Sequence, residues 1–271
     1  MPDERAALVR RLRAAGCVYA EEEADLLAAE AGTAGELADL VDRRVAGQPL
    51  EHLLGWAEFC GRRIAVGPGV FVPRARTALL VDAAAAVTGP APAVVELCCG
   101  SGAIGVLLAD RLAPRWLAAT DVDAEAVAYA RRNLAGLGAE VFHGDLFAPL
   151  PRAWHGRLDL VVANAPYVPT DAVALMPPEA RLYEAPVALD GGPDGLAVLR
   201  RVAEGAAGWL APGGHLVVEV SEGQSGALCA AMTAVGLVPV VVRDDERDAV
   251  AVTGRASGSG RSGVADGQRG N

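Results

Sequence analysis

The sequence has few aromatic residues and no excess of positive charge. Phe, Trp and Tyr make up only 4% of the 271 residues, whereas hydrophobic residues make up 52%. This composition suits a substantial core of helices packed against a valine-rich sheet. Lys and Arg number 24 against 34 Asp and Glu, so the formal net charge is −10. The lack of a basic face disfavours a duplex nucleic acid as the substrate and leaves room for a basic protein partner.

Paired cysteine motifs, a secretory leader and a membrane-spanning segment are also missing. The five cysteines include no Cys-x-x-Cys pair, so we expect reduced thiols and no metal site. The N-terminus is charged and lacks the apolar segment of a leader. The longest uncharged stretch, Gly223 to Val242, is divided by Gly236 and Pro239 into a helix and a strand. We therefore expect a cytoplasmic protein that does not enter a membrane, and we expect a monomer.

The two ends of the chain differ from its middle. Residues 1–50 carry leucines at helical spacing, with glycines as stop signals, which predicts a small helical domain of about three helices. Thr33 and Glu36 match a capping box at the start of the third helix. Residues 51–76 contain short extended runs separated by glycines, which predicts a β-hairpin linker. Residues 255–271 are rich in Gly, Ser and Arg, which predicts a disordered tail.

Residues 77–254 alternate between helical and extended patterns. Such alternation predicts an α/β domain, in which a doubly wound, Rossmann-like parallel sheet has helices on both faces. Two closing strands joined by a short turn predict an antiparallel ending. The predicted helices are 77–87, 102–112, 124–137, 195–209 and 226–235, and the seven predicted strands are 94–97, 116–121, 140–143, 158–163, 215–220, 238–243 and 249–253.

A glycine-rich turn follows the first of these strands and opens a helix. Gly100 and Gly102 would let the backbone approach a ligand closely, with Cys98 beside them. Glu96 at the strand end can reach a bound ammonium group. A second acid, Asp121, ends the next strand about 20 residues later, where it can accept ribose hydroxyls, and Val122 adjoins it.

Two kinds of cofactor compete for this turn. Gly100, Gly102 and Gly105 also fit the spacing of a dinucleotide-binding turn. However, an acid at Glu96 disfavours a pyrophosphate and suits a cationic ligand such as a sulfonium amino acid. We therefore favour a methyl donor, S-adenosylmethionine, over a dinucleotide.

The segment after the third strand, Gly144 to Phe147, is a candidate adenine contact. Asp145 could accept from the exocyclic amine of the base, while Leu146 and Phe147 line the pocket. The alternative is a turn whose aspartate bonds a backbone amide.

The string Asn164-Ala165-Pro166-Tyr167 directly follows a buried, valine-rich strand. The Asn164 side-chain oxygen and a backbone carbonyl can accept the two N–H bonds of an amide or amine, which orients its nitrogen for methyl transfer. Pro166 restricts Ala165 to extended geometry and so aims the Ala165 carbonyl. Tyr167 can stack on the planar group. The alternative is a polar turn after a strand.

These residues together resemble the HemK/PrmC family of protein-(glutamine N5) methyltransferases, which modify the Gly-Gly-Gln glutamine of peptide chain release factors. The resemblance extends from residue 5 to about residue 254, and it implies a seven-stranded class I methyltransferase domain. Further matching segments are 47–55, 66–74, 183–195 and 212–219.

The resemblance also implies roles for individual residues. Asn164, Pro166 and Tyr167 would hold the glutamine, and the helical domain would help to recognise the release factor. The donor would bind at Glu96, Cys98, Gly100, Gly102, Asp121, Val122, Asp145, Leu146 and Asn164. Phe71, Pro73 and Arg74 would shape the rim of the site, with Ala165 in the acceptor loop.

The chain departs from the family pattern at three places. Ala165 replaces the first proline of the usual Asn-Pro-Pro-Tyr loop, and Cys98-Cys99 stand where Gly and Thr are common. Pro73-Arg74-Ala75-Arg76-Thr77 lacks the second proline and the acid of the family's Pro-Arg-Pro-Glu-Thr.

Other functions therefore stay open. The acceptor could be another protein, a small molecule or a nucleic-acid base amino group, and a non-catalytic donor-binding protein is a remote alternative. Glu219 could be an acid near the site or a simple strand end, and residues 244–247 predict a solvated, charged turn.

Overall fold

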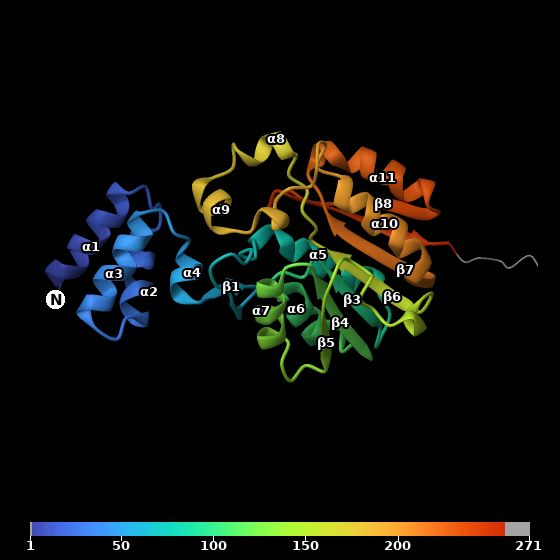
Figure 1. Cartoon of the computed structure of the whole chain (residues 1–271), viewed down its shortest axis with the longest axis horizontal. Helices are drawn as coiled ribbons and strands as arrows, with labels where there is room; N and C mark the ends of the chain where they lie inside the picture. Colours follow the sequence, from blue (N-terminus) through green and yellow to red (C-terminus); the bar gives the residue numbers. More distant parts are fainter. Residues whose placement is uncertain (1, 258–271) are drawn as a thin grey trace, which may run out of the picture.

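A computed structural model describes residues 2–257 and shows a helical unit joined by a hairpin to an α/β domain (Figure 1). The helical unit contains α1 (Pro2–Ala14), α2 (Ala20–Glu30), α3 (Ala34–Val45) and the short α4 (Leu50–Leu54). Its core centres on Leu12, Leu27 and Val41, which are fully buried. The predicted capping box is confirmed, because the Thr33 hydroxyl accepts from the Glu36 amide while the Glu36 carboxylate accepts from the Thr33 amide.

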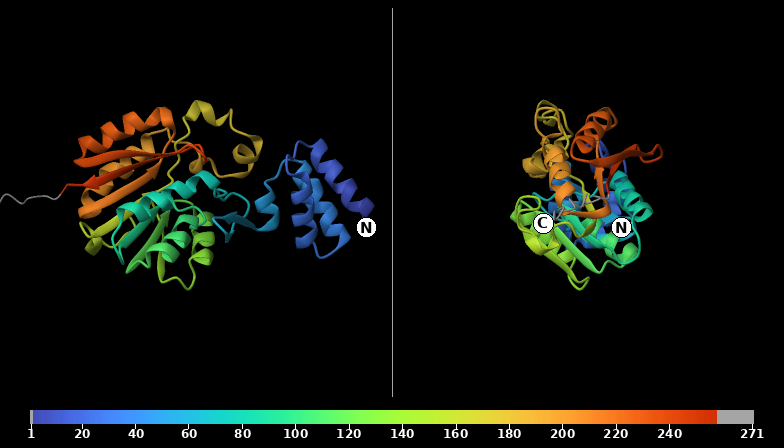
Figure 2. Two further views of the ribbon diagram at one scale, coloured as in Figure 1. Left: turned by 180° about the vertical axis from the view of Figure 1, so that it is seen from behind. Right: turned by 90° about the vertical axis from the view of Figure 1, so that its right-hand side faces the viewer.

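The predicted hairpin is confirmed as β1 (Trp56–Phe59) and β2 (Arg62–Ala65), which pair antiparallel. Figure 2 shows the helical unit standing away from the α/β domain, with this hairpin region between them. Two hydrogen bonds fix the helical unit to the linker. The indole of Trp56 donates to Glu30 at 2.9 Å, and the buried His52 ring lies 2.9 Å from the Val70 carbonyl.

The α/β domain contains the seven-stranded sheet that the sequence predicts. The strands are β3 (Ala93–Leu97), β4 (Trp116–Asp121), β5 (Ala139–His143), β6 (Leu158–Ala163), β7 (Leu210–Glu219), β8 (Leu237–Asp244) and β9 (Ala249–Ala256). Their order is β5-β4-β3-β6-β7-β9-β8, and β9 runs in the direction opposite to the other six strands. Valines and alanines fill the central strands because both faces of a parallel sheet are covered. The glycine turn after β3 and the Asn164 loop after β6 therefore lie side by side.

Helices cover the sheet on both faces. One apolar layer is formed by α5 (Ala78–Val87), α6 (Ala103–Leu112) and α7 (Ala124–Asn133), and the other by α10 (Ala197–Trp209) and α11 (Ser225–Ala234). Short 3-10 turns η1 (Ala75–Thr77), η2 (Arg152–Trp154) and η4 (Glu222–Gln224) join these elements. Among residues 2–257, no helix is long and apolar enough to cross a membrane.

The structure adds three features to the sequence prediction. The segment between β6 and α10 contains α8 (Thr170–Val173), α9 (Pro178–Tyr183) and η3 (Pro186–Ala188), which have too few apolar residues to show a helical period. β7 begins at Leu210, and its register with β6 shifts between Leu158 and Leu160, which accommodates the proline and glycines that follow Leu210. β9 extends to Ala256, so the sheet includes two residues that the sequence placed in the tail, and residues 258–271 lie outside the described chain.

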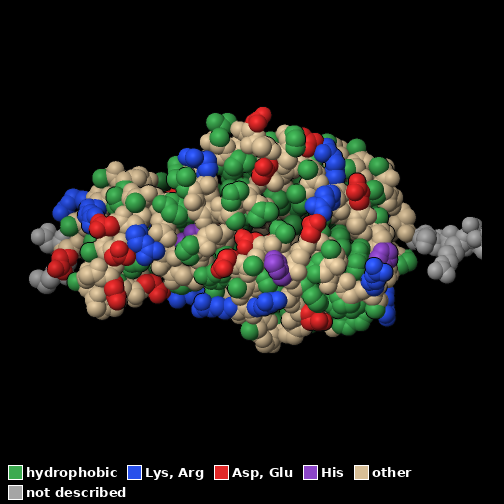
Figure 3. Space-filling view, in the orientation of Figure 1, with side chains coloured by type: hydrophobic (Ala, Val, Ile, Leu, Met, Phe, Trp, Pro, Cys, Tyr) green, Lys and Arg blue, Asp and Glu red, His purple; other side chains and the backbone are tan. Residues whose placement is uncertain are grey.

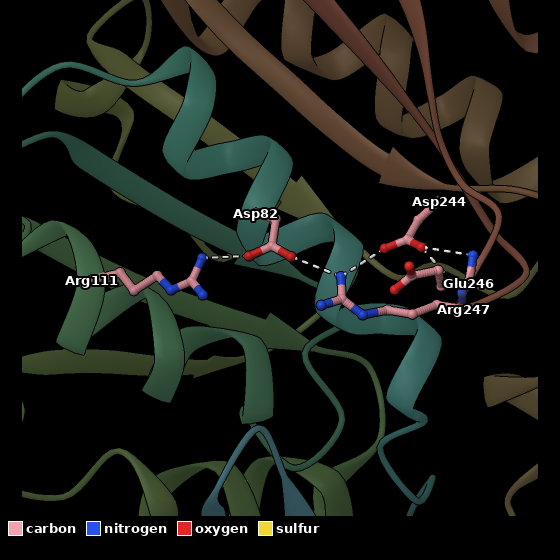
Figure 4. Close-up of polar contacts among 5 residues, drawn as sticks. All are labelled: Asp82, Arg111, Asp244, Glu246 and Arg247. Carbon is pink, nitrogen blue, oxygen red and sulfur yellow. Dashed lines mark hydrogen bonds and ion pairs between the residues drawn. The ribbon is translucent and has the colours of Figure 1, made fainter.

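The charged turn between β8 and β9 forms a surface network (Figure 4). The Arg247 guanidinium bonds Asp244 at 2.9 Å and reaches Asp82 of α5 at 2.8 Å. Asp82 also pairs with Arg111 of α6. The predicted solvated turn is therefore exposed, and Arg247 also links the edge of the sheet to α5 through its ion pair with Asp82.

Candidate functional site

One cavity of about 410 Å³ opens at the carboxyl ends of β3, β4 and β6, where parallel α/β sheets bind ligands. It is lined by the turns that follow these strands and β5, by the linker before α5, and by the segment after β6. The predicted site residues that line it are Phe71, Pro73, Glu96, Cys98, Gly100, Asp121, Val122, Asp145, Leu146, Asn164, Ala165, Pro166 and Tyr167.

The glycine-rich turn after β3 depends on unusual backbone angles. Gly100 and Gly102 have φ of +54° and +77°, a region that side chains disfavour. Cys98 adopts φ of +51° despite its side chain, at the position where the resembled family has glycine. Gly102 does not line the cavity; instead, it packs against Ala130 of α7.

The third glycine of the turn has a packing role. The Gly105 amide donates to the Glu96 carboxylate at 2.8 Å, and a Cβ at Gly105 would lie 2.6 Å from that oxygen. The glycine spacing that resembles a dinucleotide motif thus serves to bring the Glu96 carboxylate against the first turn of α6.

Glu96 is an acid with one unused oxygen. Its side chain is 1% exposed, and its Oε1 has no hydrogen-bond partner within residues 2–257. Burial raises the pKa of Glu96 to about 8, and the nearby Asp121 charge raises it further. A buried oxygen without a partner is costly, so this wall of the cavity suits a ligand that brings a cation or hydrogen-bond donor.

Asp121 is held by backbone amides at the tip of β4. Its two oxygens accept from the amides of Gly100 at 2.8 Å and Asp123 at 2.9 Å. Burial raises the pKa of Asp121. Each carboxylate oxygen can accept a second hydrogen bond, so the group can still receive two hydroxyls of a ligand.

The segment after β5 forms the far wall of the cavity. Leu146 has φ of +48°, and its carbonyl accepts from the Thr120 hydroxyl at 2.9 Å. Asp145 pairs with Arg201 of α10 at 2.5 Å, a partner that the sequence did not reveal. Phe147, which the sequence placed in the pocket, is absent from the cavity wall and stacks on Trp209 with ring centroids 5.6 Å apart.

The loop after β6 is held through both of its polar side chains. The Asn164 amide donates to the Thr77 hydroxyl at 3.3 Å, which leaves its oxygen as an acceptor. The Tyr167 hydroxyl donates to Glu219 at 2.8 Å and accepts from Arg76 at 2.9 Å. These contacts fix the side chains that the sequence assigned to the acceptor.

The backbone of this loop is also fixed from behind. Gln224 donates to the Tyr167 carbonyl at 2.9 Å. The Val168 amide donates to the Leu189 carbonyl, and the Gly191 amide donates to the Val168 carbonyl. A Cβ at Gly195 would clash with the same Tyr167 carbonyl. The loop can therefore pass close to the segment before α10 only because glycines lie there.

The rim of the cavity joins the linker to the segment around α9. Gly69 and Glu184 form a parallel bridge, and the buried Glu184 accepts from the Val72 amide and from Arg74 at 2.5 Å. Arg74 lies over the Phe71 ring, 5.1 Å from its centroid, but does not itself line the cavity.

A buried ion pair extends this frame into the helical unit. Arg44 of α3 is 8% exposed and bonds Glu23 of α2 at 2.6 Å. The same guanidinium reaches Glu179 of α9, so the helical unit contacts the segment that follows the acceptor loop.

Sequence reasoning missed several residues at this site. Arg76, Thr77, Gln224 and Arg201 all bond predicted site residues. Arg76 and Thr77 lie in the rim segment 73–77, which stood out in the sequence only for its departure from the family pattern, whereas Gln224 and Arg201 lie in no recognisable motif. Glu219, left open between an acid near the site and a strand end, is 3% exposed and bonds Tyr167. The signal that could have identified Glu219 was its position at the end of β7, the strand beside β6.

The chain is similar in sequence to known methyltransferases. Residues 63–192 match the family model described as methyltransferase small domain. The chain is 42% identical to a release factor glutamine methyltransferase of Geobacter sulfurreducens over 69% of its own length and 65% of that protein. It is 38% identical to the protein of that name from Streptomyces coelicolor, over 69% of this chain and 68% of the relative. It is 39% identical to the Moorella thermoacetica protein of the same name, over 75% of this chain and 72% of that relative.

Solved structures show the same fold. A methyltransferase from Pyrococcus furiosus aligns with a TM-score of 0.56 at 16% identity, covering 73% of this chain and 90% of that one. A ribosomal protein L11 methylase from Lactobacillus delbrueckii aligns with a TM-score of 0.52 at 17% identity, covering 72% of this chain and 85% of that one.

Proposed function

Because the chain belongs to the family of release factor glutamine methyltransferases, we propose that it transfers a methyl group from S-adenosylmethionine to the side-chain amide nitrogen of the Gly-Gly-Gln glutamine in a release factor. One observation carries the proposal. The acid-lined glycine turn and the Asn164 loop end neighbouring parallel strands and open into one cavity. A donor and an acceptor bound there would meet.

The donor half fits S-adenosylmethionine, which supplies a methyl group on a cationic sulfur when bound. Glu96 offers a buried oxygen without a partner, and Asp121 offers oxygens to two hydroxyls. Asp145 and Leu146 would border the base, with Arg201 beside them. The acids around the turn favour a positively charged ligand over a pyrophosphate.

The acceptor half fits a planar primary amide. The Asn164 oxygen would accept one N–H of the glutamine and the Ala165 carbonyl the other, while the Tyr167 ring would cover the amide plane. These contacts orient the nitrogen lone pair toward the methyl carbon. In the transfer a carbon–nitrogen bond would form as the donor's carbon–sulfur bond breaks with its electrons going to sulfur, and the nitrogen would release one proton to solvent water. Holding a weak nucleophile in line is chiefly an orientation effect.

The surface supports a protein acceptor over a duplex nucleic acid. Figure 3 shows acidic and basic side chains interspersed over most of one face, with a short row of basic ones along its lower edge. A net charge of −10 further disfavours phosphate-rich partners.

The test is methyl transfer from labelled S-adenosylmethionine to a purified release factor and to a variant with the Gly-Gly-Gln glutamine changed to alanine. The enzymes compared are the wild type, Asn164→Ala and a matched surface control, Arg247→Ala. We expect label only on the wild-type factor, with a loss of at least about 100-fold for Asn164→Ala and none for Arg247→Ala. Donor binding without label on either factor would contradict the release-factor proposal and direct the search to other acceptors.

A further inference from the structure

Arg76 occupies an unexpected place for a cation. It precedes α5 in the segment 73–77, at the position where the resembled family has an acid. Its Nε donates to Glu219 at 3.1 Å and its Nη2 donates to the Tyr167 hydroxyl at 2.9 Å. The Tyr167 hydroxyl donates to the same Glu219 oxygen at 2.8 Å. Three side chains from distant parts of the sequence therefore close a triangle of hydrogen bonds.

The triangle uses both hydrogen-bonding functions of the tyrosine. A phenol has one proton to donate, and here Glu219 receives it while Arg76 donates to the oxygen. The hydroxyl is thus committed to the protein, and only the ring remains for the acceptor. Burial and the Glu219 charge raise the pKa of Tyr167, which keeps the hydroxyl protonated.

Glu219 and Arg76 also depend on each other. The Glu219 carboxylate is 3% exposed, and its second oxygen has no partner within residues 2–257. Arg76 is the cation that pairs with it, and its side chain is 46% exposed at the cavity. A rigid, planar guanidinium can bond both neighbours at once, which a lysine ammonium does less well.

We propose that Arg76 and Glu219 are positioning residues that fix the angle of the Tyr167 ring and thereby the binding of the acceptor. This inference rests on the proposed function, since it assigns Tyr167 to the acceptor half of the cavity. Neither residue touches the donor turn, so their effect should fall on the acceptor alone.

The sharpest variant is Tyr167→Phe, which keeps the ring and the Arg76–Glu219 pair and removes only the hydroxyl. Arg76→Ala removes the cation, and the double change Arg76→Ala with Glu219→Gln avoids leaving a buried charge unpaired. Hydrogen bonds to charged groups predict a rise in acceptor KM on the order of tenfold for each variant. Donor Kd should stay within about twofold, and Arg76→Ala combined with Tyr167→Phe should be no worse than Arg76→Ala alone.

Hydrogen exchange without any acceptor separates this proposal from the proposed function. Each Arg76, Glu219 or Tyr167 variant should speed amide exchange in peptides covering 164–168 and leave it unchanged in peptides covering 97–105. The control variant Arg247→Ala should change exchange in neither set of peptides. If wild-type enzyme fails to methylate a release factor but the exchange pattern holds, the substrate assignment fails and the positioning role stands. Unchanged exchange and acceptor KM, or additive effects of Arg76→Ala and Tyr167→Phe, would overturn the positioning role.

Discussion

The two halves of the cavity are built in different ways. The half that we propose for the donor comes from consecutive strand–turn–helix units within residues 96–146, and its shape depends on left-handed backbone angles at Cys98, Gly100 and Leu146. The acceptor half brings together residues from the linker, from the loop after β6, and from the segments near Glu184 and Gln224. One half is therefore local and set by backbone geometry, whereas the other is assembled from distant side chains.

This difference has a functional meaning. A turn fixed by its own backbone can bind one cofactor with little dependence on the rest of the chain. An acceptor site held by side chains from several segments can be altered by changing a few residues, and Arg76, which stands where the resembled family has an acid, is one residue that differs. The buried contact of Arg44 with Glu179 further connects the acceptor side to the helical unit.

The largest selective effect is expected from Gly195→Ala. Gly195 has φ of +72°, and a Cβ there would clash with the Tyr167 carbonyl and with Gln224. The acceptor loop must shift, and a displacement of about 1 Å can lower the rate about 100-fold. Donor Kd, measured by calorimetry, should stay within about threefold. An equal loss of donor affinity would show that the two halves are not separate.

The reciprocal change is Gly105→Ala, in which the new methyl group meets the Glu96 carboxylate and Leu134. We expect donor Kd to rise about tenfold and the free energy of unfolding to fall by about 1–3 kcal/mol. The matched control is Gly226→Ala, where a Cβ meets nothing within 4 Å. The control should keep donor affinity and gain up to about 1 kcal/mol, because alanine favours the helix. Identical behaviour of the two variants would contradict the role given to Gly105.

Donor binding should depend on pH through Glu96, whose pKa burial raises to about 8. Below that pH the unliganded enzyme holds a proton that a cationic ligand expels, so affinity should rise with pH, by up to about tenfold per unit, and level off above 8. Because the folded pKa lies above the usual 4.5, the unliganded fold should lose stability as pH rises from 4.5 to 8.

Glu96→Gln provides the control for both effects, because its amide oxygen can still accept from Gly105 but does not titrate. Calorimetry across pH 5–9 measures the donor affinity, and urea unfolding over the same range measures the stability of the unliganded fold. If the donor affinity and stability of the wild-type enzyme follow the same pH curves as those of Glu96→Gln, titration of Glu96 is not the cause of the pH dependence.

The smallest effect is expected outside both halves, at Arg247→Ala. Its ion pairs with Asp82 and Asp244 are solvent-exposed, and such pairs contribute little. We expect unchanged transfer and a fall in Tm of no more than about 2 °C, which should disappear in high salt. A large loss of transfer would mean that α5, which follows Arg76 and Thr77, relays surface changes to the acceptor half.

Much of the fold could be predicted from the sequence because its signals are local. The alternation of valine-rich strands with amphipathic helices identified all seven strands of the sheet, and Thr33 with Glu36 identified a helix start. The turn proposed for the donor and the loop proposed for the acceptor could be located in the sequence because each is a continuous segment that directly follows a strand.

The tertiary structure decided what the sequence left open. It placed Phe147 in the core against Trp209, gave Gly105 its role beside Glu96, and brought Arg76 and Glu219 to Tyr167. These contacts join residues far apart in the chain, and no local pattern of charge or hydrophobicity encodes which distant partner a side chain will meet. The sequence by itself determined the order of strands and helices and the residue types at each strand end, whereas only the packing of those elements decided which side chains face one another across the cavity.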